Sequence, residues 1–455
     1  MCDASTLDMP PPAEAVSRRK AVPGKCIKCK TAKPNVAIRR IQYCRQCFVK
    51  ASVSKFRMAV GRSRKCVDWP RAKVMIALSG GPTSSAMLRL TADLQTMDLR
   101  GKDAMPPFAG AVVGHIDESC LFPSSAEGKI RDIAAESGLQ LETLALEHVF
   151  LPTEDRPALL ELVQASLASG SASEQFCARF SKPEKDVPCA EQLRMLFSKL
   201  TSPTDKEDML QAIKTALLVQ LARNSGCGVI FVGDSSTRIA VKAMALIGRG
   251  RGFSLPLEVG AESQWFQDIV AVRPMRDFVA KEVAFFNCWT RQPTAFVPTF
   301  TTAEHRRASI NRLAEAFIVE LDQGFASTVP TVCRTLQKLE TRPDALAAAP
   351  CLVCGMPVEP DANIWRTCLT IDGNAPEPAP ESNANDAFDI TSCLCYSCQS
   401  MLRHTTPGAR LPGFCTSRLH AAAAGSFLPS ENHEQLRRQI ENFIICDSDD
   451  DSDNN

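Results

Sequence analysis

The sequence lacks an apolar run long enough to cross a membrane. Its longest apolar stretches, such as Val74–Leu78 and Gly228–Val232, fall far short of the ~18 residues that a membrane-spanning helix needs. The amino terminus carries Pro10, Pro11 and Pro12, where a secretory signal needs an apolar core. We therefore expect a globular cytoplasmic protein without a membrane partner.

Acidic residues are scarce at the front of the chain. The net charge is only +1, yet Arg18–Lys73 contains eighteen Lys or Arg residues and one acid, Asp68. The sign reverses in 446–455, an aspartate-rich tail that is too charged to pack. A basic end region suits contacts with nucleic-acid phosphates, and the alternative is ordinary solvated surface.

Disulfides are not the expected explanation of the 20 cysteines, because a long chain without a secretory signal belongs in a compartment where thiols stay reduced. Metal ligation is the better explanation. Two C-x-x-C pairs lie fourteen residues apart near the front, close to the spacing at which four thiolates bind one tetrahedral zinc. Two more pairs lie forty residues apart near the end, with Cys393 as a competing ligand. The predicted ligands, for about two zinc ions, are Cys26, Cys29, Cys44, Cys47, Cys351, Cys354, Cys395 and Cys398.

Buried strands and amphipathic helices alternate from Ala72 onward, which indicates a mostly parallel sheet with helices on both faces. The expected strands are 74–78, 110–116, 141–146, 228–232 and 270–273. The expected helices are 86–94, 126–137, 209–224, 237–247 and 277–290. The prediction is an α/β fold flanked by two small cysteine-rich zinc modules.

The expected organisation follows these changes of pattern. Residues 1–21 are expected to lack fixed structure, 22–68 to form an N-terminal zinc module with a basic stretch, and 69–335 to form the α/β domain. A C-terminal zinc ribbon is expected in 345–402, with a loop insertion at 357–385, then an extension at 403–445 before the acidic tail.

A Ser-Gly-Gly turn joins the first expected strand to a helix. Such a turn aims backbone N–H groups and the positive helix end at one point, which suits a pyrophosphate. The candidate nucleotide-binding residues are Ser79, Gly80, Gly81 and Ser84. The alternative is that the glycines only make a tight turn.

The loop resembles the ATP-pyrophosphatase (PP-loop) signature, in which Ser-Gly-Gly-Lys-Asp-Ser binds ATP. Further matches are Gly233–Arg238, Gly248–Gly250, and Val272–Asp277 leading into Lys281–Ala284. With the cysteine pairs, these motifs resemble the tRNA 2-thiolation protein 2 family, the second subunits of the eukaryotic cytoplasmic tRNA thiolase, over about Cys26–Cys398.

That resemblance implies a function and partners. The reaction would be ATP-dependent 2-thiolation of the wobble uridine, giving 5-methoxycarbonylmethyl-2-thiouridine in tRNAs for lysine, glutamate and glutamine. The partners would be a catalytic thiolase subunit in a heterodimer, tRNA, and a ubiquitin-like sulfur carrier.

Departures from the signature predict a non-catalytic subunit. Pro82-Thr83 replaces Lys-Asp, so the ammonium for the phosphates and the carboxylate for Mg²⁺ are missing. Thr237-Arg238 stands where the catalytic relatives carry an acidic pair. ATP binding by this chain is therefore in doubt.

Two alternative functions remain open on the sequence. One is an active ATP-dependent tRNA sulfurtransferase, in which a central cysteine carries sulfur; the candidates are Cys177, Cys189, Cys227 and Cys288, which otherwise are small buried hydrophobic residues. The other is a zinc-ribbon RNA-binding protein unrelated to thiolation.

The predicted RNA contacts form two groups. The basic stretch Lys50–Lys73 would contact phosphates that position the RNA. Glycine-flanked arginines lie in a loop where ligands of open α/β sheets bind. The residues are Lys55, Arg57, Arg62, Arg64, Lys65, Arg249 and Arg251.

Overall fold

The computed structural model describes residues 24–38, 41–96, 108–123, 126–151, 187–325, 327–362, 390–406 and 409–423. The chain divides into two compact units, Met1–Ser54 and Lys55–Asn455. The predictions for segment 1–21, Cys177 and the tail 446–455 lie outside the described residues, as do much of the 357–385 insertion and of the 403–445 extension.

The first unit carries a turn and a short antiparallel hairpin. Strands β1 (Val36–Ile38) and β2 (Ile41–Tyr43) pair with Val36 opposite Tyr43. The backbone N–H of Ile27 donates to the carbonyl of Gln42 at 3.0 Å, which ties the turn to the hairpin. Helix α1 (Arg45–Arg62) begins here and continues into the second unit.

The second unit is built on a six-stranded sheet with the order β5-β4-β3-β6-β8-β7. The strands are β3 (Lys73–Ala77), β4 (Gly110–Asp117), β5 (Gln140–Ala145), β6 (Val229–Phe231), β7 (Glu262–Ser263) and β8 (Val270–Val272). All neighbours pair in parallel except β7, which is antiparallel to β8. The strand order reverses beside β3, so the loop that follows β3 lies where open α/β sheets bind ligands.

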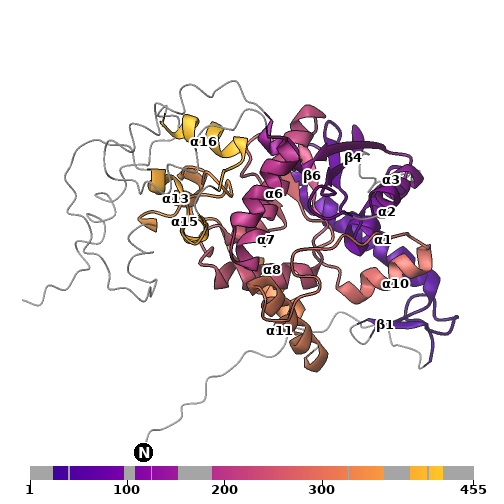
Figure 1. Ribbon diagram of the computed structural model, residues 1–455. Coiled ribbons are helices and arrows are strands. Elements are labelled where there is room, and N and C mark those ends of the chain that lie inside the picture. The colour runs from indigo at the N-terminus through magenta and orange to yellow at the C-terminus, as the bar shows by residue number, and fades with distance from the viewer. Residues whose placement is uncertain are drawn as a thin grey trace, which may run out of the picture. The chain divides into compact units, whose positions relative to one another are not determined.

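The two faces of the sheet are covered by different elements. Alternate strand residues point to opposite faces, so neighbouring residues of one strand meet different coverings. Met75, Val112 and Ile230 belong to one hydrophobic core with α6 (Cys189–Lys199), α7 (Pro203–Asn224) and the C-terminal cysteine module. Phe231, the next residue along β6, instead packs its ring against Phe56, Trp69 and Phe108 at centroid distances of 6.3, 5.9 and 5.8 Å. Figure 1 shows α6 and α7 on one side of the strands, and α2 and α3 on the other.

Further helices complete the second unit. They are α2 (Pro82–Thr96), α3 (Ala126–Glu136), α8 (Ser236–Gly248), α9 (Leu255–Val259), α10 (Ala280–Thr290), α11 (Ile310–Gly324), α12 (Thr328–Leu336), α13 (Pro343–Ala347), α15 (Tyr396–Arg403) and α16 (Gly413–Ala423). Short 3-10 turns are η1 (Ser63–Lys65), η2 (Leu146–Phe150) and η4 (Ile390–Cys393). Helices α11 and α12 pack on α8 and α9 in a second hydrophobic cluster. Among the described residues, no helix combines the length and apolarity that crossing a membrane would take.

The structure confirms the predicted fold class, a mostly parallel α/β sheet with helices on both faces and a four-cysteine cluster in each unit. Two helices begin earlier than the pattern predicted. Helix α2 starts at Pro82 and α7 at Pro203, because proline is well suited to the first position of a helix. At α7 the Ser202 hydroxyl accepts a hydrogen bond from the N–H of Thr204 at 3.2 Å and caps the helix.

Candidate phosphate loop and metal centres

The loop between β3 and α2 is held by a glycine that no other residue can replace without strain. Gly80 has φ of +76°, and a Cβ there would lie 2.8 Å from Cγ1 of Ile130 and 3.0 Å from Cβ of Ala295. The N–H of Ala295 donates to the carbonyl of Gly80 at 2.8 Å. Packing and hydrogen bonding therefore set this turn without a ligand.

The four candidate nucleotide-binding residues come together at the start of α2. The Ser84 hydroxyl donates to the carbonyl of Gly81 at 3.0 Å and lies 3.2 Å from the Ser79 hydroxyl. Ser84 is buried, whereas Ser79 is exposed. The loop has the shape of a phosphate-binding turn, but the Ser84 hydroxyl is already hydrogen-bonded within the loop.

Charged groups suited to ATP activation are not provided by the loop. Pro82 and Thr83 form the first positions of α2. Acidic residues that follow neighbouring strands are engaged elsewhere: Asp234 lies 3.5 Å from Arg273, and Glu118 is paired with Lys214. A carboxylate held in an internal ion pair is poorly placed to bind Mg²⁺.

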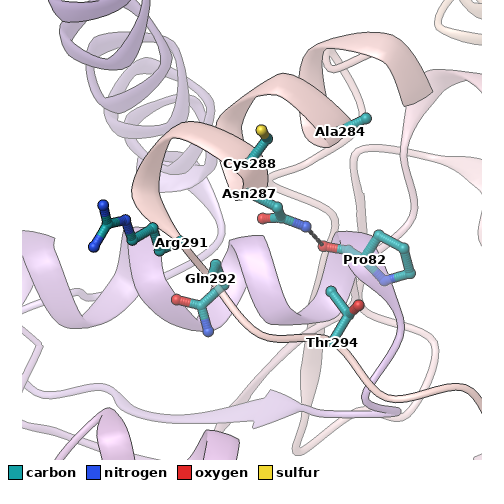
Figure 2. A pocket seen from close by; sticks show the side chains of 7 residues that line it. All are labelled: Pro82, Ala284, Asn287, Cys288, Arg291, Gln292 and Thr294. Atoms are coloured by element: carbon teal, nitrogen blue, oxygen red, sulfur yellow. Dashed lines mark hydrogen bonds between the residues drawn. The ribbon is translucent and has the colours of Figure 1, made fainter.

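A pocket of about 480 Å³ opens beside the loop, between the start of α2 and the end of α10 (Figure 2). Asn287 donates its amide N–H to the carbonyl of Pro82 at 2.8 Å, while its Oδ1 atom is buried without a hydrogen-bond partner. The lining residues are Pro82, Ala284, Asn287, Cys288, Arg291, Gln292 and Thr294. They supply amide, hydroxyl, thiol and guanidinium groups but include no carboxylate for a metal ion.

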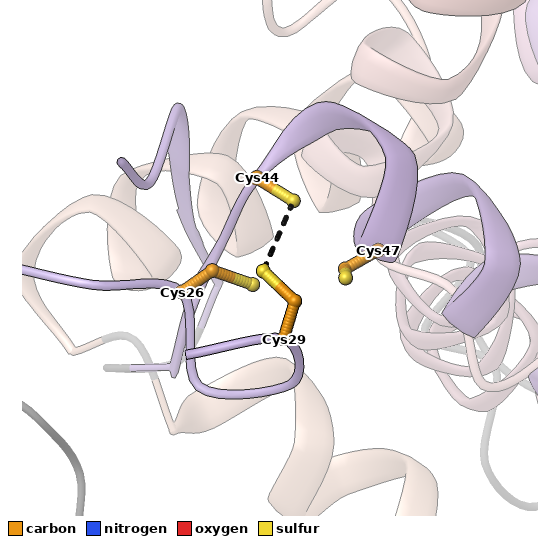
Figure 3. A group of neighbouring side chains, drawn as sticks. All are labelled: Cys26, Cys29, Cys44 and Cys47. Carbon is orange, nitrogen blue, oxygen red and sulfur yellow. Dashed lines mark hydrogen bonds between the residues drawn. The ribbon is translucent and has the colours of Figure 1, made fainter. Parts of the chain in front are cut away.

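Four cysteines gather in the first unit, as the spacing predicted. Cys26 and Cys29 come from the turn before β1, and Cys44 and Cys47 from the start of α1 (Figure 3). Their Sγ atoms all lie within 4.8 Å of one another, and Cys29 and Cys44 are 3.9 Å apart. Zinc–sulfur bonds of ~2.3 Å in a tetrahedron place sulfurs about 3.8 Å apart. One metal ion fits this set.

The second cluster is deeply buried. Cys351, Cys354, Cys395 and Cys398 are 0%, 9%, 2% and 5% exposed, and their sulfurs also lie within 4.8 Å of one another. Cys354 and Cys395 are 3.7 Å apart, and the N–H of Cys395 points at the Cys351 sulfur at 3.4 Å. An N–H donor favours a thiolate over a thiol. Cys393, the predicted competitor, is outside this group.

Each cluster could bind one metal ion through four thiolates, a ligand set that zinc and iron–sulfur centres share. In the part of the chain that the structure describes, these are the only groups of three or more His, Cys, Asp or Glu side chains close enough to share an ion. Cys189, Cys227 and Cys288 lie on separate elements and are half-buried, buried and exposed. The central cysteines therefore do not assemble a third centre within the described residues.

The predicted RNA contacts fall into exposed and buried groups. Arg62, Arg64 and Lys65 are exposed at the end of α1 and in η1, although Arg62 also pairs with Asp277 at 2.7 Å. Lys55 is half-buried, with its ammonium 2.8 Å from Glu282. Arg57 is half-buried on the same helix.

Arg249 and Arg251 lie inside the protein. Their side chains are each only 9% exposed, and they pair with Asp208 and Glu258. A buried guanidinium with an internal partner is not available to a phosphate. Both guanidiniums are engaged inside the protein, and an RNA contact by Arg249 or Arg251 stays a prediction.

The chain is similar to known proteins in sequence and in structure. A family model described as cytoplasmic tRNA 2-thiolation protein 2 matches residues 309–400. The Bos taurus protein of that name is 37% identical over 365 residues, covering 72% of this chain and 71% of its own, and the Homo sapiens protein is 34% identical over 400 residues, covering 78% and 75%. The U34-tRNA thiolase of Methanococcus maripaludis with its 4Fe-4S cluster superposes with a TM-score of 0.47 and 15% identity, over 70% of this chain and 90% of that one.

The parallel sheet, the Ser-Gly-Gly turn into α2 and the two four-cysteine clusters define an open-sheet α/β protein with candidate metal centres. The sequence identity to the Bos taurus and Homo sapiens proteins, and the share of the chain that they cover, then identify the family. The chain belongs to the cytoplasmic tRNA 2-thiolation protein 2 family.

Replacing Gly80 should test whether the turn is structural. Gly80→Ala should lower the free energy of unfolding by about 1–3 kcal/mol, because alanine is strained at positive φ and its Cβ meets Ile130. Gly128→Ala is the matched control: on helix α3, with nothing within 4 Å of its Cβ, it should raise stability by about 0.5–1 kcal/mol. Urea unfolding followed by circular dichroism measures both, and equal effects would contradict a packed turn.

Each of the two cysteine clusters should account for one bound metal ion. The purified chain should hold about two metal ions, and Cys26→Ser/Cys44→Ser or Cys351→Ser/Cys395→Ser should each remove about one. Cys288→Ser is the control and should keep both. Elemental mass spectrometry measures the content, and a full complement in either double variant would exclude that cluster as a metal site.

Proposed function

We propose that this chain is the non-catalytic subunit of a cytoplasmic tRNA thiolase heterodimer. It supports 2-thiolation of the wobble uridine in tRNAs for lysine, glutamate and glutamine, while a catalytic relative activates ATP and a ubiquitin-like carrier supplies sulfur. The observation that carries the proposal is the Pro82-Thr83 pair in the phosphate loop of a chain from a family named for tRNA 2-thiolation.

The loop geometry supports a scaffolding role. Adenylation needs positive charge and a metal to neutralise developing phosphate charge. Here the loop contributes a proline and a threonine at those positions, and Asp234 is paired with Arg273. The turn is nevertheless retained, because Gly80 packs against Ile130 and Ala295.

We further propose that both clusters hold zinc and that they maintain structure. Four thiolates without a histidine or an open position form a closed site, which is typical of structural zinc. In each cluster the four cysteines would fill all positions of a tetrahedral metal ion, so no position is left for a substrate. Cytoplasmic location is proposed from the names of the relatives.

The surface proposed to meet tRNA is the exposed basic end of α1 with η1. Arg62, Arg64 and Lys65 are close in sequence and exposed. Such side chains contribute sequence-independent attraction to phosphates, which would position tRNA for the catalytic partner.

The isolated chain should not activate ATP. Incubated with ATP, Mg²⁺ and substrate tRNA, it should release no pyrophosphate above background, whereas adding both the catalytic partner and the sulfur-loaded ubiquitin-like carrier should give thiolated tRNA. A Cys288→Ser chain should support thiolation equally well, since no sulfur is carried on this chain. Adenylate formed steadily by the chain alone, or thiolation lost in the Cys288 variant, would favour the alternative of an active sulfurtransferase.

Charge reversal should weaken tRNA binding. Arg64→Glu/Lys65→Glu should lower the affinity for tRNA and reduce the slope of log affinity against log salt by about two, one for each lost phosphate contact. Arg334→Glu/Lys338→Glu is the matched control, since both residues are exposed elsewhere. Fluorescence anisotropy at several salt concentrations measures both. An unchanged slope in the first variant would mean that this stretch is ordinary solvated surface.

A further inference from the structure

The loop that follows β8 lies at the carboxyl ends of the parallel strands, the edge at which open α/β sheets bind ligands. The N–H of Arg276 donates to the carbonyl of Arg273 at 3.3 Å, and Nε of Arg273 lies 3.5 Å from Oδ2 of Asp234. The N–H and the hydroxyl of Ser236 both donate to the carbonyl of Phe278, at 2.8 and 2.9 Å. The loop is therefore tied to the amino-terminal end of α8, whose backbone carries partial positive charge.

Arg276 presents one edge of its guanidinium without a partner. The residue is 5% exposed, and within the described part of the chain its Nε and Nη2 atoms are both buried with no hydrogen-bond partner. Buried donors that stay unsatisfied cost free energy, and the cost is larger on a charged group. Burial also lowers the pKa of Arg276, and the nearby Asp277 carboxylate reverses this only in part. An acceptor with two negatively charged oxygens would relieve both costs.

The carboxylates that follow Arg276 in the sequence are paired with cations of α1. Asp277, the next residue, accepts a hydrogen bond from Arg62 at 2.7 Å. Both oxygens of Glu282 accept from the Lys55 ammonium, at 2.9 and 2.8 Å. Among the described residues, these pairings leave Arg276 without a carboxylate of its own.

Another arginine of this protein shows what the same edge holds when it is filled. Arg223 donates from Nε and Nη2 to the two carboxylate oxygens of Asp268, both at 2.8 Å. Such a two-point contact is the usual way in which arginine binds a carboxylate or a phosphate. Arg276 offers the same two donors in a more buried place, where a charged hydrogen bond is stronger.

We propose that Arg276 binds a phosphate group through its Nε and Nη2 atoms at the carboxyl edge of the sheet. Phosphate is favoured because the site adjoins further positive charge: Arg62, which pairs with the next residue, is on the exposed basic end of α1. The Asp277 side chain is 23% exposed, so the loop reaches solvent one residue from the Arg276 guanidinium. The phosphate can belong to an RNA backbone or to a free phosphate compound, and the site does not depend on the proposed role in thiolation.

Thermal unfolding of the full-length chain distinguishes a ligand-binding arginine from a structural one. Without ligand, Arg276→Gln should melt no lower than wild type, because the change removes a buried charge whose donors lack partners. Inorganic phosphate, ATP without Mg²⁺ and tRNA are then added separately. At least one should raise the melting temperature of the wild-type chain, because it binds the folded state. The variant should bind that probe about 10–100-fold more weakly by titration calorimetry, the effect of losing hydrogen bonds to a charged group.

Two further variants make the result specific to this guanidinium edge. Arg276→Lys keeps the charge but not the two parallel donors, so it should also bind more weakly than wild type. Arg223→Gln is the matched control, because it removes the same edge from an arginine that is already paired, and it should respond to the probe as wild type does.

The three probes identify the source of the phosphate. A response to inorganic phosphate or ATP indicates a free phosphate compound, and a response to tRNA alone indicates the RNA backbone. The inference is overturned by a wild-type chain that none of the three stabilises, or by an Arg276→Gln chain that binds the probe as tightly as wild type.

Discussion

The C-terminal half of this protein depends on one buried group of four cysteine sulfurs. Cys351, Cys354, Cys395 and Cys398 share one hydrophobic core with α6, α7 and one face of the sheet. Thiolates in such a place need a cation among them, because the surrounding apolar side chains cannot solvate them. Gly250, just after α8, packs against Tyr396 of this module, and Arg418 of α16 donates to its carbonyl groups. The core around the cluster therefore joins the described C-terminal residues, up to Leu419, to the sheet.

The turn between β3 and α2 is held by contacts within the protein. Its shape comes from Gly80, the hydrogen bond from Ala295 and the packing of Ile130, none of which needs a nucleotide. The charged groups that would make it reactive are side chains, and side chains can be replaced without changing the turn. The shape of the turn therefore does not depend on the side chains that an ATP-activating loop would need.

Much of the sheet could be predicted because periodicity reports local burial. The expected strands lie within a few residues of β3, β4, β5, β6 and β8. The five expected helices correspond to α2, α3, α7, α8 and α10, although α2 and α7 begin earlier, at Pro82 and Pro203. Helix α1 was not predicted: its residues were interpreted only as a basic stretch, since Phe56 and Val60 pack on the core between many charged residues. The cysteine ligands were correctly grouped because paired spacing is a local property.

The sequence alone determined the α/β alternation, the two groups of four cysteines and the loss of Lys-Asp from the loop, because each is encoded in a short stretch of chain. Only the tertiary structure decided which charges are buried. Gly250 and Tyr396 are far apart in sequence, and nothing local indicates that they meet. The arginines expected at an RNA surface turned inward because a left-handed glycine and the ring of Tyr396 set the direction of their loop.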